Sequence, residues 1–255
     1  MSTRVAVVVV SSALVLFGPG VSRAVAVGVS DNFEDGNYTA NPAWNIWLNQ
    51  GTDGGVVPDP IRSGNLAWKA RGSESGFELI KTTDFAPMPW EGFRSSVEFL
   101  TTTSTRFHGA IELFDDGVTQ KLEGYGVHLS HDVTSGDQAK LSWEEFNPSA
   151  PTVVTKSTWF PLSLVPINEW LRLSMWHDPV SGKVNADVRR VSDNQLVVED
   201  SLTPVVFGGP RPLSELRIAV GELEWQYMDN ATLTPEPATF AMLILGGLGA
   251  MRRRR

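Results

Sequence analysis

The chain has 255 residues, 42% of them hydrophobic, which suffices for one sizeable core or two small domains. The absence of cysteine excludes disulfides, thiolate metal sites and a cysteine nucleophile. The formal net charge is −8, and between Asp31 and Glu236 the chain carries 15 basic against 29 acidic residues. Because such an acidic chain repels the phosphate backbone of DNA or RNA, we expect no nucleic-acid partner.

The first 26 residues have the features of a secretory signal peptide. Arg4 precedes an apolar run from Val5 to Phe17, a Gly-Pro-Gly breaker follows, and residues 24–26 read Ala-Val-Ala, the small-x-small pattern of a signal-peptidase site. The apolar run is shorter than the roughly 20 residues that a membrane-spanning helix needs. We therefore expect export, with signal peptidase as a transient partner and a mature chain that begins at residue 27.

Residues 27–234 are predicted to form one all-β domain, an antiparallel β-sandwich. No stretch of twelve residues has the apolar spacing of an amphipathic helix, and short alternating runs are separated by clusters of Gly, Pro, Asn and Asp. Many strands at this spacing are typical of sandwiches. Examples of the strands that we expect are residues 95–101, 109–114, 125–130, 140–145, 170–176, 183–191, 195–199 and 216–227.

Acidic residues occur at both ends of this predicted domain. Asp31, Glu34 and Asp35 open it, and Asp229 lies near its end. Because a sandwich brings its first and last strands close together, these carboxylates could gather around one cation with the oxygen ligands that Ca²⁺ prefers. The alternative is that Asp35 belongs to a turn and that Asp229 ends a strand, since turns favour such residues. A structural calcium is thus one of two open interpretations.

Nine tryptophans distinguish the composition. Indoles stack on the apolar faces of sugar rings, although most tryptophans are packed in cores. In the predicted strand 170–176, alternation places the aliphatic side chains on one face, which we expect to be core: Leu171, Leu173 and Met175. The opposite face is aromatic and polar, and it supplies the candidate ligand-binding residues Trp170, Arg172 and Trp176.

Residues that could carry catalysis are few. Glu222 and Glu224 project to one face of the predicted strand 216–227, and a glycosidase needs two neighbouring carboxyl groups. The alternative is a pair of glutamates on a solvent face. The apolar pattern of this strand changes phase in its middle, so we expect a β-bulge near Gly221. His128 and His131 are three residues apart, which places them on opposite faces of a strand and argues against a shared metal site.

Three segments carry a resemblance to a known fold family. They are the opening SDNFEDGNYTANPAWN, the sequence NEWLRLSMWHDPVSGKVNADV and the closing MDNATL. These resemble the concanavalin A-like lectins and glucanases, including laminin-G-like domains, and the resemblance implies a jelly-roll sandwich that often holds a structural calcium. The laminarinase-like branch carries Glu-x-Asp-x-x-Glu, a pattern from which residues 222–227 depart. The resemblance therefore does not extend to the catalytic pattern of the glucanases.

The last 21 residues have a tripartite order. Pro235, Glu236 and Pro237 precede an apolar segment at residues 238–251, and four arginines follow: Arg252, Arg253, Arg254 and Arg255. As a helix the apolar segment is about 21 Å long, short of a hydrocarbon core of about 30 Å. By the positive-inside rule the arginines keep the C-terminus in the cytoplasm, so the preceding domain faces outward.

This order resembles the PEP-CTERM sorting signal of Gram-negative bacteria that make extracellular polymer. The resemblance implies an exosortase as partner, transient anchoring in the inner membrane, processing of the tail and delivery to the cell surface or extracellular matrix. A plain C-terminal anchor is the alternative. For the domain itself the sequence leaves three hypotheses: a non-catalytic protein that binds extracellular polysaccharide, a purely structural exopolymer protein, or a glycan hydrolase or lyase that uses Glu222 and Glu224.

Overall fold

The computed structural model of the chain describes residues 28–40, 42–49, 52–72, 77–83, 85–88, 92–102, 106–115, 124–131, 133–146, 153–203, 212–221 and 225–235. Two short 3₁₀ turns, η1 (Val133–Ser135) and η2 (Leu162–Leu164), accompany the strands. The strands are β1 (Val29–Asp31), β2 (Asn45–Asn49), β3 (Thr52–Pro58), β4 (Leu66–Arg71), β5 (Phe77–Thr82), β6 (Phe93–Thr101), β7 (Phe107–Asp115), β8 (Gly124–His131), β9 (Gln138–Phe146), β10 (Val153–Pro161), β11 (Trp170–Asp178), β12 (Lys183–Arg190), β13 (Leu196–Leu202), β14 (Leu213–Gly221) and β15 (Gln226–Pro235).

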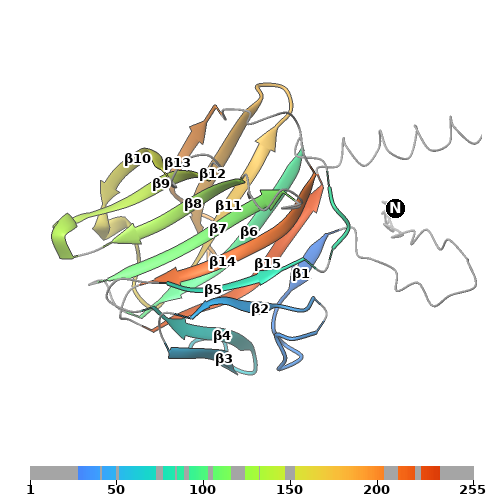
Figure 1. The fold of residues 1–255 in the computed structure, drawn as a ribbon. Coiled ribbons are helices and arrows are strands. Elements are labelled where there is room, and N and C mark those ends of the chain that lie inside the picture. Colours follow the sequence, from blue (N-terminus) through green and yellow to red (C-terminus); the bar gives the residue numbers. More distant parts are fainter. Residues whose placement is uncertain are drawn as a thin grey trace, which may run out of the picture.

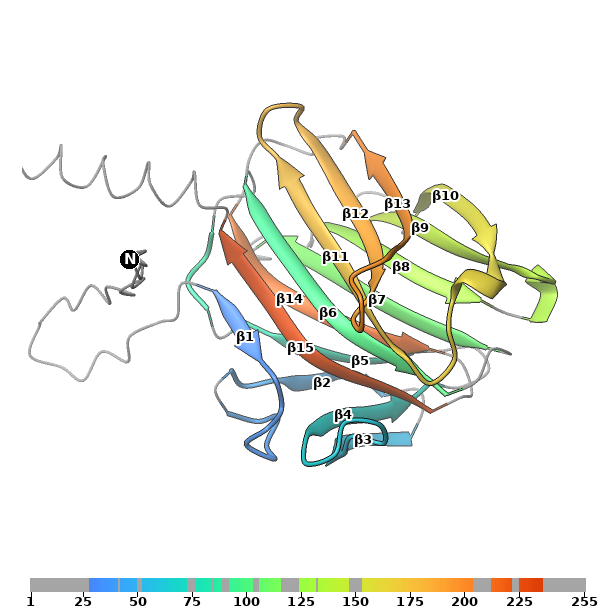
Figure 2. The ribbon, with the colours of Figure 1, turned by 180° about the vertical axis from the view of Figure 1, so that it is seen from behind.

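The strands form two antiparallel sheets that stack face to face (Figure 1). Sheet A has the order β13-β12-β11-β6-β15-β4-β3, and β1 also pairs with β15. Sheet B has the order β10-β9-β8-β7-β14-β5-β2. Figure 2 shows the molecule from the side of sheet A, with β6, β11 and β15 at its centre. This architecture confirms the predicted all-β sandwich.

The hydrophobic core lies between the sheets. Leu171, Leu173 and Met175 of β11 are buried in it, which confirms the predicted aliphatic face. Sheet B contributes alternate residues such as Ile111 of β7 and Val127 of β8. Since neighbouring side chains on a strand point to opposite faces, the residues between these project from the outer surface of each sheet.

The predicted strand at residues 216–227 is two strands in different sheets. β14 ends at Gly221 in sheet B, and β15 begins at Gln226 in sheet A. The change of phase in the apolar pattern therefore reflects a crossing between sheets, and the predicted bulge at Gly221 is wrong. Strands β1 to β5 and β10 lie outside the ranges given as examples, and several of them are short or carry glycine and proline, as β3 does with Gly54, Gly55 and Pro58.

Both termini lie outside the described residues. This applies to the predicted signal peptide at residues 1–26 and, in the predicted sorting segment, to Glu236, Pro237 and the arginines Arg252, Arg253, Arg254 and Arg255. Pro235 is the last residue of β15 and pairs with Phe93. Within the described part of the chain, no helix has the length and apolarity needed to cross a bilayer.

Candidate functional site

The predicted ligand-binding residues lie on the outer face of sheet A. Trp170 is only 4% exposed and packs in a small cluster with Ala67 and Leu100. Trp176 is half-buried, and the guanidinium carbon of Arg94 lies 5.0 Å from its ring centroid. The two indoles therefore do not form an open aromatic surface, because each is covered in part by an arginine.

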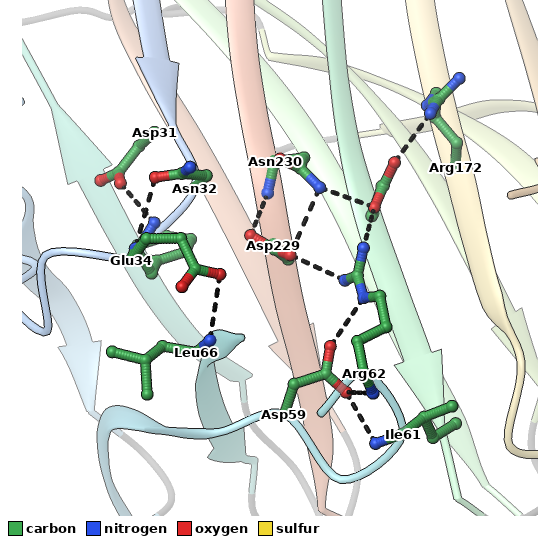
Figure 3. Close-up of polar contacts among 12 residues, drawn as sticks. Asp31, Asn32, Glu34, Asp59, Ile61, Arg62, Leu66, Arg172, Asp229 and Asn230 are labelled. Atoms are coloured by element: carbon green, nitrogen blue, oxygen red, sulfur yellow. Dashed lines mark hydrogen bonds and ion pairs between the residues drawn. The ribbon is translucent and has the colours of Figure 1, made fainter. Parts of the chain in front are cut away.

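Arg62, in the loop between β3 and β4, is the centre of a polar cluster on this face (Figure 3). Its Nε donates to Asp59 Oδ2 at 2.7 Å, its Nη1 to Glu98 Oε2 at 3.0 Å and its Nη2 to Asp229 Oδ2 at 2.7 Å. The guanidinium carbon lies 4.1 Å from the ring centroid of Trp170. A sugar ring cannot stack on Trp170 while Arg62 occupies that position.

The same cluster holds the predicted site residue Arg172. Its Nη2 donates to Glu98 Oε1 at 2.8 Å, and Asn230 Nδ2 donates to Glu98 Oε2 at 2.8 Å. Burial raises the pKa of Asp229 to about 7 even though Arg62 donates to it. Residues predicted for two separate sites, Arg172 and Asp229, thus belong to one network that fastens the loop to sheet A.

The four predicted calcium ligands are bound to donors of the protein itself. Strands β1 and β15 pair as expected, but Asp31 accepts hydrogen bonds from Phe33 N at 2.7 Å and from the Trp44 indole at 2.6 Å. Glu34 accepts from Leu66 N, and Asp229 accepts from Arg62 (Figure 3). Asp35 accepts from Asn37 N. Among the described residues, no group of three acidic or histidine side chains is placed to hold a metal ion.

The predicted catalytic pair, Glu222 and Glu224, lies outside the described residues. The structure instead places a different set of titratable groups on the outer face of sheet B, where sequence analysis had predicted none. Glu112 of β7, Gly126 of β8 and Glu144 of β9 are register partners across three adjacent strands. His128 lies two residues further along β8 on the same face.

His128 stands between the two glutamates. Its Nε2 lies 3.7 Å from Glu112 Oε1 and 3.6 Å from Glu144 Oε2, distances too long for hydrogen bonds. Its Nδ1 is 2.8 Å from Nε2 of His108, which fixes the orientation of the ring. His128 is 3% exposed, and its Nε2 has no hydrogen-bond partner among the described residues. A buried polar atom without a partner is costly, so this atom marks a position where a ligand group would be favourable.

Burial controls the protonation of this cluster. It lowers the pKa of His108 to about 4 and that of His128 well below its usual value, so both rings are neutral near pH 7. It raises the pKa of Glu112 to about 7, and it also raises that of Glu144. Within the described part of the chain, neither glutamate is ion-paired with Lys or Arg, whereas buried Glu215 pairs with both Lys81 and Arg217.

Gly126 permits the close approach of these groups. A Cβ atom at this position would lie 2.7 Å from His128 Nε2 and 3.2 Å from Glu112 Cγ. The first distance is below any ordinary contact, so a larger residue would displace the histidine. The missing side chain between Glu112 and Glu144 is therefore part of how the cluster is built.

Trp159 of β10 lies on the same outer face. It is 49% exposed, and it is the one exposed tryptophan among those whose side chains the structure describes. Its register partner is Lys140 of β9, whose Nζ is 5.7 Å from the ring centroid. Lys140 is in turn opposite Ser130, and Ser130 is opposite His108. We call this surface the sheet B face; its members are Trp159, Lys140, Ser142, His108, His128, Glu112 and Glu144.

The sequence matches no protein-family model and no curated protein. In fold it is similar to a legume lectin-like domain from Entamoeba histolytica, with 8% identity over 84% of this chain and 99% of that chain and a TM-score of 0.54. It is also similar to the carbohydrate recognition domain of Emp46p in its potassium-bound form, with 10% identity, 82% and 97% coverage and a TM-score of 0.51. The winged bean acidic lectin complexed with methyl-α-D-galactose is also similar, with 10% identity over 81% of this chain and 97% of that chain and a TM-score of 0.50. The class of fold is thus the legume-lectin, or concanavalin A-like, β-sandwich.

Proposed function

We propose that this protein is a non-catalytic carbohydrate-binding protein and that glycan binds on the sheet B face. The observation that carries the proposal is the position of Trp159, an exposed indole on the same surface as a row of polar side chains. An indole offers its flat face to the apolar side of a sugar ring, while neighbouring polar groups can hydrogen-bond its hydroxyls. The lectin folds of the similar structures support this assignment.

The two outer faces differ in what they offer a ligand. On sheet A, Arg62 and Arg94 lie over the rings of Trp170 and Trp176. On sheet B, Trp159 is half exposed, and His128 Nε2 has no hydrogen-bond partner among the described residues. A sugar on sheet B could therefore form a hydrogen bond with His128 Nε2. On sheet A a sugar would have to displace Arg62 or Arg94 from the indole rings.

The location is a proposal that rests on the sequence of the two ends. Residues 1–26 support export, and residues 235–255 support recognition by an exosortase followed by release to the cell surface or matrix. Cell fractionation with mass spectrometry of both termini tests this. We expect a mature chain that starts at residue 27 and lacks the arginine tail; an intact chain in the cytosol would overturn the location.

Binding of the purified protein to a panel of bacterial polysaccharides tests the function. We expect Trp159→Ala to weaken binding at least tenfold, about 1.4 kcal/mol, whereas Leu164→Ala, which removes a side chain of similar exposure (47%), leaves it unchanged. Loss of binding in Trp176→Ala alone would move the site to sheet A. A protein that binds no polysaccharide would instead support the purely structural alternative.

A further inference from the structure

On the sheet B face, Glu112 and Glu144 form no ion pair with lysine or arginine among the described residues, although Arg217 is the register partner of Glu112. Glu98, Glu215 and Asp229 are each ion-paired with an arginine. Glu112 and Glu144 have only His128 within ion-pair distance among the described residues, and that ring is neutral near pH 7. A buried carboxylate without a cation is strongly disfavoured, so a cation that enters this position relieves that cost, against the loss of its own hydration.

Three acceptor atoms lie close together in this cluster. Glu112 Oε1 and Glu144 Oε2 lie 3.7 and 3.6 Å from His128 Nε2. If Nδ1–H of His128 donates to His108, Nε2 carries a lone pair and is the third acceptor. An ammonium group has three N–H donors and no acceptor, which matches three acceptors that have no other donor.

The nearest basic side chains, Lys140 and Arg217, do not pair with these acceptors among the described residues. Lys140 lowers the pKa of Glu144 through space, and Arg217 lowers that of Glu112, but burial outweighs both effects. Arg217 is paired with Glu215, and Lys140 lies beside the indole of Trp159. Neither forms an ion pair with Glu112 or Glu144 in the described part of the structure.

We propose that Glu112, His128 and Glu144 bind the protonated amine of an unacetylated amino sugar. The inference rests on the proposed function and deepens it, because it assigns the chemical class of the ligand. Trp159 contacts a sugar ring of any kind, whereas the three acceptors select the ring that carries an ammonium group. An N-acetyl group at that position replaces three donors by one and removes the charge, so it loses most of this interaction.

Titration calorimetry with three oligosaccharides of equal length and linkage tests the inference at slightly acidic pH. One is an oligomer of glucosamine, the second of N-acetylglucosamine and the third of glucose. We expect the glucosamine oligomer to bind at least tenfold more tightly than the other two, with release of a proton, because the ammonium favours ionised Glu112. The preference should fall below about threefold in Glu112→Gln and in Glu144→Gln. Glu199→Gln, an exposed change on sheet A, should retain it.

Trp159→Ala separates the two proposals, because it should weaken all three oligomers by a similar factor while the ratio between them persists. Equal binding of the three oligomers by the natural protein, or a preference that survives both glutamine variants, would overturn the amino-sugar assignment and leave glycan binding intact. Failure of all three oligomers to bind would also overturn it, and the polysaccharide panel would then decide the broader function. Circular dichroism of each variant confirms that it is folded.

Discussion

The guanidinium of Arg62 covers the indole of Trp170, with 4.1 Å between the guanidinium carbon and the ring centroid. The same guanidinium binds Asp59, Glu98 and Asp229. One side chain from a loop thus binds three carboxylates and covers the ring of a tryptophan. The sequence of β11 suggests a sugar-binding surface, but this contact shows that Trp170 helps to hold the loop between β3 and β4 on sheet A.

Arg62→Ala should destabilise the protein by about 2–4 kcal/mol, because it removes the cation that is paired with buried Asp59 and Asp229. Urea unfolding measures this change. The loss should be smaller at about pH 5 than at pH 8, since protonation of Asp229 relieves the repulsion. Arg190→Ala removes an exposed ion pair with Asp193 and should have a much smaller effect, because solvent screens such pairs. Equal effects of the two changes would contradict the role of Arg62.

Trp170→Ala should reduce stability without reducing glycan affinity. The side chain is buried on the outer face of sheet A, and truncation of a buried tryptophan costs about 3–5 kcal/mol. Thermal melting and polysaccharide binding, measured on the same preparation below the melting temperature, separate the two effects. A variant with normal stability and no binding would return the site to sheet A.

Glu112→Gln should change how stability depends on pH. The native pKa of Glu112 is about 7 against an ordinary value of 4.5, so the native state binds more protons than the unfolded state between these values. The contribution of Glu112 is therefore most favourable below about pH 4.5 and is lost as the pH rises through 7. The glutamine variant should be more stable than the natural protein at about pH 8, on the order of 3 kcal/mol, and nearly equal to it at pH 4.5. Urea unfolding at both values decides; equal stability at pH 8 would show that Glu112 is solvated.

Gly126→Ala should disturb the His128 cluster directly. The added methyl group would lie 2.7 Å from His128 Nε2, so the ring must move away from the glutamates. We expect a loss of about 1–3 kcal/mol in stability and a higher pKa for His128, since a displaced ring is better solvated. Titration of the imidazole protons by NMR measures the second effect. An unchanged His128 titration would mean that the strand accepts the methyl group without rearrangement.

Alternation within one strand could be read from the sequence, and contacts between strands could not. The core face of β11 follows from the spacing of Leu171, Leu173 and Met175, and the structure confirms it. The sequence also places His128 and His131 on opposite faces, as the structure does, with His131 stacked against Phe107 of the core. The partner of His128 is His108, twenty positions earlier, and only the pairing of β7 with β8 brings the two rings together.

The order of strands in the sheets accounts for the remaining differences. Glu112 and Glu144 are separated by 32 residues in the chain, yet both flank Gly126 because β7, β8 and β9 are neighbours. No pattern in the neighbouring sequence predicts that Gly126 makes room for His128 and Glu112, because these contacts depend on the pairing of strands. The change of sheet between β14 and β15 likewise appears in the sequence as a phase break, which has the same signature as a bulge within one strand.

Glycan binding on the sheet B face is tested most directly by two affinities for the same polysaccharide. One is that of the natural protein, which must bind the polysaccharide, and the other is that of Trp159→Ala. We expect at least a tenfold loss in the variant, with unchanged thermal stability because Trp159 is half exposed. Undiminished affinity in a folded Trp159→Ala protein would contradict the account.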